Sequence, residues 1–116
     1  MKVVISNRDK YIRKEVVRNL IGQYPNCVTE SYEDSMLAAK AVYNEPADVI
    51  IIGADGIKLI PMLRKKDDKL KIVILADNNN HRDNAFSVGA DAYITLPLSS
   101  DELFSAVEGT IEKDYI

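Results

Sequence analysis

The chain has 116 residues, of which 15 are Lys or Arg and 18 are Asp or Glu, so its formal net charge is -3. Its length suits one hydrophobic core, and its 47% hydrophobic and 28% charged residues exclude disordered, collagen-like and coiled-coil classes. The acidic balance disfavours direct binding of nucleic acid, which needs clustered cationic side chains. No apolar run is long enough to span a membrane, and a single cysteine, Cys27, cannot form an internal disulfide. We therefore expect one cytoplasmic domain that comprises residues 1–116.

Short apolar runs recur along the chain and predict buried strands. Three of them are continuous and mostly β-branched, at residues 3–5, 49–52 and 72–75. Weaker strands are expected at 27–30 and 92–94. Continuous runs, as opposed to alternating ones, are typical of parallel strands that are covered by helices on both faces.

The segments between these runs have the apolar spacing of helices. Residues 99–102 read as a capping box that begins the last helix, and residues 82–88 are the least regular helix. The apolar stripes are formed by Ile12, Val16, Val17, Leu20 and Ile21; by Met36, Ala39 and Tyr43; by Ile57, Ile60 and Leu63; and by Leu103, Val107 and Ile111. The alternation of strands and helices predicts an α/β domain with an open, doubly wound parallel sheet, in which ligands bind at the carboxyl ends of the strands.

Residues 89–98 read Gly-Ala-Asp-Ala-Tyr-Ile-Thr-Leu-Pro-Leu. This segment resembles the pattern G-A-D-x-Y-[IL]-x-K-P-[FL] of response-regulator receiver domains at every position except the lysine. The resemblance extends over essentially the whole chain. It implies a CheY-like, flavodoxin-like fold whose five parallel strands lie in the order 2-1-3-4-5, with helices on both faces. It also implies a cis peptide bond before Pro97, a bond type that proline makes accessible.

Phosphorylation in this family uses two acidic residues that hold Mg²⁺, an acceptor aspartate, a Thr or Ser, and a Lys. The resemblance places these roles, in the same order, on Asn7 and Arg8, Gly53, Ala76, and Leu96. Gly53 has no side chain to phosphorylate, and Arg8 opposes a second cation. The sequence therefore resembles a pseudo-receiver, a non-enzymatic domain that signals without phosphorylation and for which neither Mg²⁺ nor any other cofactor is expected.

Two alternatives remain open at the strand ends. Asp9, Asp55 or Asp77 could replace the missing acceptor or ligands, and a shifted register could bring Asp55 to the acceptor position; helix caps and turns are the competing interpretation of all three. Arg8 could instead bind an anion or a small metabolite.

A protein-binding or dimerisation face is expected on the fourth helix, fifth strand and fifth helix. Its candidate residues are Phe86, Tyr93, Ile94, Leu98, Phe104 and Glu108. Within the family, the aromatic residue at the position of Tyr93 takes part in the signalling switch. The domain could stand alone or be the N-terminal regulatory part of a transcriptional regulator. His81 and the run 64–66 are interpreted as solvated residues at helix ends.

Overall fold

The computed structural model describes residues 1–109. Five strands form one parallel sheet in the order β2-β1-β3-β4-β5. The elements are β1 (Lys2–Ser6), α1 (Lys10–Gln23), β2 (Val28–Tyr32), α2 (Ser35–Asn44), β3 (Val49–Ile52), the 3-10 helix η1 (Ala54–Leu59), α3 (Ile60–Lys66), β4 (Lys71–Ala76), α4 (Arg82–Ser87), β5 (Ala92–Thr95) and α5 (Ser100–Glu108). The predicted fold class and strand order are confirmed.

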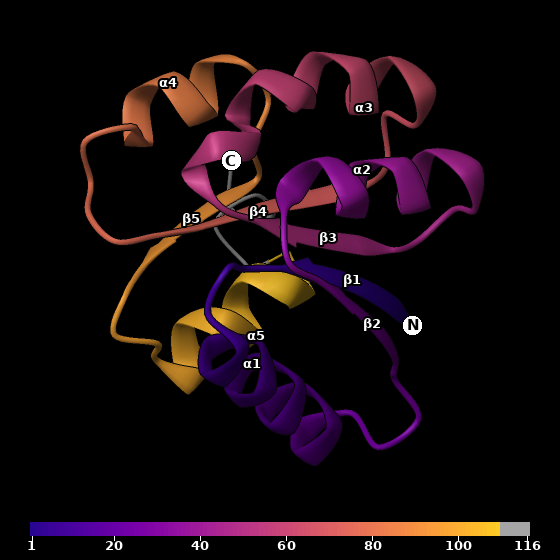
Figure 1. Ribbon diagram of the computed structural model, residues 1–116, viewed down its shortest axis with the longest axis vertical. Helices are drawn as coiled ribbons and strands as arrows, with labels where there is room; N and C mark the ends of the chain where they lie inside the picture. Colours follow the sequence, from indigo (N-terminus) through magenta and orange to yellow (C-terminus); the bar gives the residue numbers. More distant parts are fainter. Residues whose placement is uncertain (110–116) are drawn as a thin grey trace.

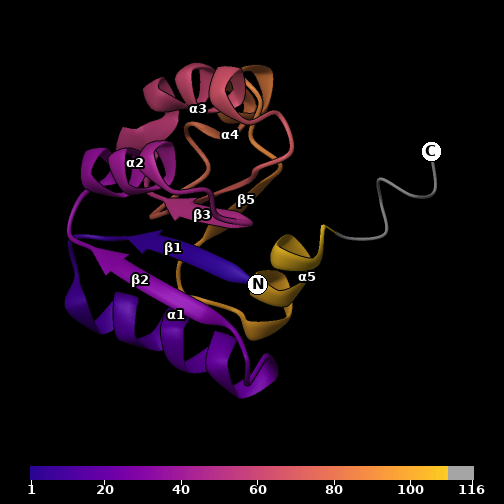
Figure 2. The same cartoon turned by 90° about the vertical axis from the view of Figure 1, so that its right-hand side faces the viewer.

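Helices cover both faces of the sheet. Helices α2, α3 and α4 lie on one face, and α1 and α5 lie on the other (Figures 1 and 2). Each face has its own hydrophobic cluster, because side chains along a strand alternate between the two sides. Strand β3 is buried at all four positions, as its continuous apolar run predicts.

The predicted stripes differ in how well they identify the buried face of each helix. In α1, Val16 and Leu20 are fully buried, but Ile21 is 45% exposed. The stripes through Ile57, Ile60 and Leu63 and through Leu103 and Val107 are buried. Ile111 lies outside the described residues.

The apolar stripe predicted for α2 does not identify the buried face of that helix. Met36 and Tyr43 are 50% and 44% exposed, and the buried residues of the helix are Ser35, Ala38, Ala39 and Val42. Small side chains on this face let α2 lie close to the sheet and to η1. A Cβ atom on Gly56 would lie 2.9 Å from Cβ of Ser35, so the contact needs glycine on one side and a small residue on the other.

The reading of Arg64 as a solvated helix end is also wrong. Its side chain is 22% exposed and reaches from α3 to the segment that precedes β5. Its guanidinium donates hydrogen bonds to the carbonyl of Gly89, at 2.7 and 3.0 Å, and to that of Leu70, and it pairs with Asp91. Lys65 and Lys66 are exposed, as predicted, and His81 is an exposed residue at the start of α4.

Candidate functional site

A cleft of about 350 Å³ lies at the carboxyl ends of β1, β3 and β4. This is the edge at which open α/β sheets bind their ligands. Its walls come from the loops after these strands and from the start of α2. The lining residues are Ser6, Asn7, Arg8, Glu33, Asp34, Ser35, Gly53, Ala54, Asp55, Leu75, Ala76 and Asp77.

Four of the five positions matched to phosphorylation roles line this cleft, and the fifth does not. Asn7 and Arg8 follow β1, Gly53 follows β3, and Ala76 ends β4. Leu96 instead packs against the hydrophobic cluster beneath α1 and α5. Burying an apolar side chain away from water is favourable, so Leu96 is more stable in this cluster than in a polar cleft.

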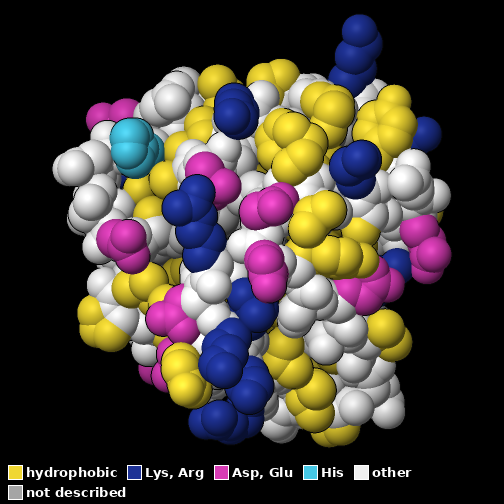
Figure 3. Space-filling view, viewed as in Figure 1, with side chains coloured by type: hydrophobic (Ala, Val, Ile, Leu, Met, Phe, Trp, Pro, Cys, Tyr) yellow, Lys and Arg dark blue, Asp and Glu magenta, His cyan; other side chains and the backbone are white. Residues whose placement is uncertain are grey.

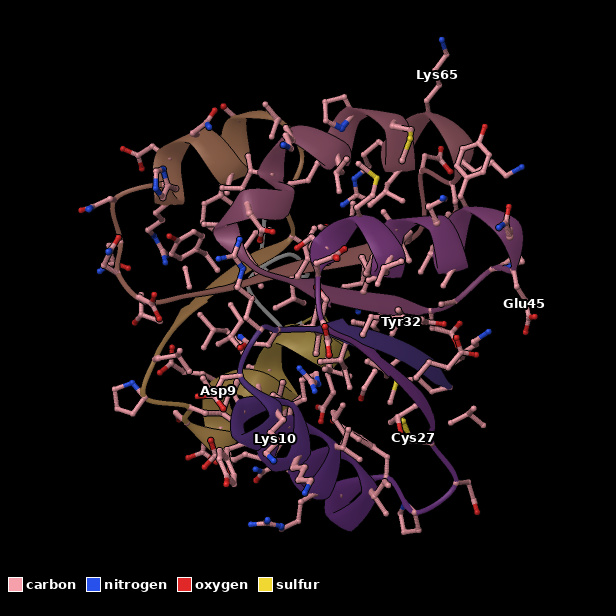
Figure 4. The ribbon with its side chains drawn as sticks, viewed as in Figure 1. Asp9, Lys10, Cys27, Tyr32, Glu45 and Lys65 are labelled. Atoms are coloured by element: carbon pink, nitrogen blue, oxygen red, sulfur yellow. The ribbon has the colours of Figure 1, made fainter. Side chains whose placement is uncertain are left out.

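The loop after β1 is fixed by its own polar contacts. Arg13 donates to the backbone carbonyl of Asn7 at 2.6 Å, and the Asn7 side chain accepts from the backbone N–H of Asp9 at 2.9 Å. Asp9 in turn caps α1 by accepting from the N–H of Tyr11 at 2.8 Å. Asp9 is thus a helix cap at the start of α1 (Figure 4), and it does not line the cleft.

Asp55 reaches back toward the position of the missing acceptor. A Cβ atom built on Gly53 would lie only 2.8 Å from Oδ1 of Asp55, so this carboxylate takes up room that an acceptor side chain would need. The register shift that would place Asp55 itself at the end of β3 does not occur, because β3 ends at Ile52 and η1 follows at once.

A chain of buried hydroxyls holds the Asp55 carboxylate. Ser35 donates to Oδ1 of Asp55 at 3.0 Å, and the hydroxyls of Ser6 and Ser35 are 3.3 Å apart. Ser6 and Ser35 are 1% and 2% exposed, and they are the two buried polar residues among those described. Sequence reasoning missed both, although a serine at the end of an otherwise apolar strand was a usable signal.

The charges in the cleft bear on two classes of ligand, an anion and the Mg²⁺ of the family. Four carboxylates face one guanidinium across the lining, which disfavours an anion at Arg8. Mg²⁺ prefers near-octahedral oxygen ligands, including one or two carboxylates. Within residues 1–109, however, no group of three or more His, Cys, Asp or Glu side chains is placed to hold a metal ion. Asn7 and Arg8 stand at the two positions where the family has acidic Mg²⁺ ligands, and the positive charge of Arg8 opposes a second cation there.

The side chain of Tyr93 is in a buried position. It is 6% exposed, and its hydroxyl donates to the backbone carbonyl of Asn78 at 2.6 Å. That carbonyl lies in the loop after β4, two residues beyond Ala76, which has no hydroxyl to offer. The peptide bond between Leu96 and Pro97 is cis, as expected.

The six candidate interface residues do not come together on one surface. A groove of about 510 Å³ runs between α4, β5 and α5, and its lining includes Phe86, Tyr93 and Ile94. Phe86 is 39% exposed, whereas Tyr93 and Ile94 contribute from buried positions. The other three, Leu98, Phe104 and Glu108, are not among the lining residues.

Phe104 and Glu108 contact the end of α1 instead. The ring of Phe104 meets that of Tyr24 edge to face, with centroids 5.9 Å apart, and the Tyr24 hydroxyl donates to the Glu108 carboxylate. Burial, together with the bond to Glu108, raises the pKa of Tyr24 above its ordinary value. These residues therefore join α5 to α1. Burial also raises the pKa of the nearby Cys27 thiol, which lies just before β2 (Figure 4).

The topology defines a doubly wound, flavodoxin-like α/β domain. A sequence profile of the response regulator receiver domain matches residues 4–108, and the chain belongs to this family. Receiver domains are generally signalling modules rather than enzymes. Among the residues described, no helix is long and apolar enough to cross a membrane.

Solved structures with this fold include receivers from different signalling systems. The chemotaxis response regulator CheY4 of Vibrio cholerae is 20% identical over 92% of this chain and 95% of its own, with a TM-score of 0.77. A DNA-binding response regulator of the LuxR family from Staphylococcus aureus is 19% identical over 92% and 95%, with a TM-score of 0.78. The receiver domain of a sensor histidine kinase from Pseudomonas aeruginosa, with magnesium in its active site cleft, is 16% identical over 92% and 93%, with a TM-score of 0.79.

Proposed function

We propose that this domain is a pseudo-receiver of the cytoplasm, which transmits signals through protein contacts and without phosphorylation or Mg²⁺. The observation that carries the proposal is the composition of the strand-end cleft. Gly53 supplies no acceptor, and Arg8 adds a cation where the family uses acidic residues. Leu96, at the lysine position, packs outside the cleft. The chemistry of phosphoryl transfer needs each of the groups that are replaced here.

We further propose that the partner binds at the groove between α4, β5 and α5. The groove presents an exposed aromatic ring, Phe86, under the guanidinium of Arg82, whose Cζ is 5.1 Å from the ring centroid. Asp101 and Glu102 add negative charge on the α5 side. An aromatic anchor with a polar rim is the composition of many protein interfaces. The similarity to a LuxR-family regulator supports an output in transcription when an effector domain is attached.

The decisive experiment exposes the purified domain to acetyl phosphate and Mg²⁺ and follows its intact mass. We expect no phosphoryl adduct under conditions in which a phosphorylatable receiver, tested in parallel, is fully modified. A stoichiometric adduct would overturn the proposal. The variant Asp55→Asn would then locate the adduct, because its loss in this variant would identify Asp55 as a substitute acceptor.

A further inference from the structure

The cationic side chains of this chain are unevenly distributed. Of its 15 Lys and Arg residues and its 18 Asp and Glu residues, five and two respectively lie in residues 7–23, which form the loop after β1 and helix α1. This segment has a formal net charge of +3, whereas the remaining residues, with ten cationic and sixteen acidic side chains, have -6. Figure 3 shows Lys and Arg side chains gathered over α1, in the lower part of the view. A molecule with a negative net charge therefore has a positive surface at α1.

The solvent side of α1 combines cations with two exposed apolar side chains. We call it the α1 outer face, and its residues are Lys10, Tyr11, Lys14, Arg18 and Ile21. Spacings of three and four residues connect them along one side of the helix, opposite the buried Val16 and Leu20. The Tyr11 and Ile21 side chains are 70% and 45% exposed, and Nζ of Lys10 lies 5.4 Å from the Tyr11 ring centroid.

Two acidic residues accompany the cations of this segment. Asp9 lies at the start of α1, where its carboxylate caps the helix. Glu15 is exposed and is the acidic residue within α1 itself. The three cations of the α1 outer face outnumber Glu15, and Arg8 is a further exposed cation in the preceding loop.

The acidic residues of the neighbouring elements have contacts or positions away from this face. On α5, which lies beside α1, Asp101 and Glu102 line the groove toward α4 and β5. Glu108 accepts a hydrogen bond from the tyrosine that follows α1. On β2, Glu30 forms an ion pair with Lys2. The positive charge of the α1 outer face is therefore not cancelled by the elements on either side of it.

The shape and composition of the face favour a lipid surface as its partner. Figure 2 shows α1 on the outside of the domain, with no other element covering it. The strand-end cleft and the groove between α4, β5 and α5 are lined by other residues, so the α1 outer face is the convex surface of one helix. Protein partners are anchored in pockets, whereas an anionic bilayer takes cations at its headgroups and apolar or aromatic side chains in its interfacial layer. The backbone of a DNA duplex would contact the cations but offers no apolar layer for Tyr11 and Ile21.

We propose that the α1 outer face binds the surface of an anionic membrane. Lys10, Lys14 and Arg18 lie against the headgroup phosphates, and Tyr11 and Ile21 enter the interfacial layer. Helix α1 is roughly 21 Å long, so it lies along the surface, and the acidic remainder of the domain is repelled from it, which fixes one orientation. The groove between α4, β5 and α5 stays free for the partner of the proposed function, on which this inference does not depend.

The first test measures the share of the purified domain that sediments with vesicles of phosphatidylglycerol and phosphatidylcholine in equal parts. We expect binding at low salt that about 0.5 M NaCl abolishes, and none to phosphatidylcholine alone. The double variant Lys14→Gln with Arg18→Gln should lower the partition coefficient about 25-fold, because each cation near an anionic surface contributes about fivefold.

The matched control removes two cations from other elements. Lys40→Gln with Lys58→Gln, at exposed positions of α2 and η1, gives the same net charge and should bind like the unmodified chain. Absence of binding to the mixed vesicles, or equal losses in the two double variants, overturns the proposal. Either result leaves the test of phosphorylation unaffected.

The second test locates the contact and separates lipid from nucleic acid. The chain has no tryptophan, so a single one reports on its own surroundings. Tyr11→Trp should shift its fluorescence emission to shorter wavelength when the mixed vesicles are added. Tyr43→Trp, at a 44% exposed position of α2, should not shift. A shift at position 43 and none at position 11, or binding to a short DNA duplex as tight as to the vesicles, contradicts the membrane contact proposed for α1.

Discussion

The strand-end cleft and the junction between α3 and β5 depart from the receiver pattern to different degrees. In the cleft, every position matched to phosphorylation has lost the group that handles phosphate or metal. At the junction, the pattern is present and each residue has a structural contact. Gly89 has φ +115, a conformation that favours glycine, and its carbonyl accepts from Arg64. Asp91 accepts a hydrogen bond from the N–H of Ile72 at 2.8 Å and forms an ion pair with Arg64. The Tyr93 hydroxyl donates a hydrogen bond to a backbone carbonyl in the loop after β4.

The difference separates two kinds of residue within one family pattern. Residues of the pattern that fix the path of the chain are present here, whereas the five positions that the resemblance matches to phosphorylation hold other residue types. At the acceptor position, the Asp55 carboxylate takes up room that an acceptor side chain would need, and it accepts a hydrogen bond from the buried Ser35. We therefore expect substitutions at the junction to change stability most, and substitutions in the cleft to change it less.

Arg64→Ala should have the largest effect. It removes the hydrogen bonds to Gly89 and Leu70 and the ion pair with the mostly buried Asp91. Removing one partner of a largely buried ion pair should lower the free energy of unfolding by about 3 kcal/mol. Urea unfolding measures this change. Lys65→Ala removes an exposed neighbour and should change stability by less than about 0.5 kcal/mol, so equal effects of the two variants would contradict the role of Arg64.

Gly56→Ala tests the packing between η1 and α2. The new Cβ atom would lie 2.7 Å from Cδ1 of Ile52 and 2.9 Å from Cβ and Oγ of Ser35, so the elements must move apart. We expect a loss of about 2 kcal/mol in the free energy of unfolding. Gly22→Ala in α1 meets nothing within 4 Å and should instead stabilise the helix by about 0.5 to 1 kcal/mol. Thermal or urea unfolding of both variants should show opposite signs.

Much of the fold could be predicted because the strands are continuous apolar runs. Residues 49–52 and 72–75 are strands that helices cover on both faces. The buried face of α2 was harder to predict, because it is made mostly of Ala and Ser, with Val42, while larger apolar residues lie outside. Hydrophobic periodicity weights large side chains, so it selects the wrong face where close approach of the backbone decides the packing.

The sequence predicted several residues that line the candidate site, but it did not predict the side-chain contacts within it. The resemblance located Asn7, Arg8, Gly53 and Ala76, which do meet in one cleft. It could not show that Asp55 turns back toward Gly53, because that depends on the 3-10 turn of η1. The role of Arg64 was missed for a similar reason. Two of its acceptors are the backbone carbonyls of Leu70 and Gly89, and backbone groups leave no mark in a pattern of residue types.

Ser35→Ala tests how much the hydrogen bonds of the cleft contribute to stability, compared with those of the junction between α3 and β5. It removes the donor to Asp55 and the neighbour of the buried Ser6 hydroxyl. A partly buried hydrogen bond to a carboxylate contributes about 1.5 kcal/mol, so we expect that loss in urea unfolding, smaller than the loss for Arg64→Ala. Ser105→Ala, at an exposed position of α5, should have an effect within about 0.5 kcal/mol of zero. A loss as large as that of Arg64→Ala would remove the distinction between the two regions.

The smallest effect is expected where α1 meets α5. Tyr24→Phe keeps the edge-to-face contact with Phe104 but removes the hydroxyl that donates to the exposed Glu108, so it should lower the free energy of unfolding by about 0.5 kcal/mol. Because folding raises the pKa of Tyr24, the protonated phenol stabilises the folded state fully below its ordinary pKa of 10.0. That stabilisation is lost as the pH rises above this value.

Urea unfolding between pH 8 and 11 separates this titration from a simple loss of packing. The unmodified chain should lose more stability than Tyr24→Phe as the pH passes 10.0, the ordinary pKa of the phenol. The two chains should therefore approach each other in stability at the alkaline end. Tyr11→Phe is the matched control, because the Tyr11 side chain is 70% exposed on the same helix. A constant difference between Tyr24→Phe and the unmodified chain across this range would show that the Tyr24 hydroxyl does not couple α1 to Glu108.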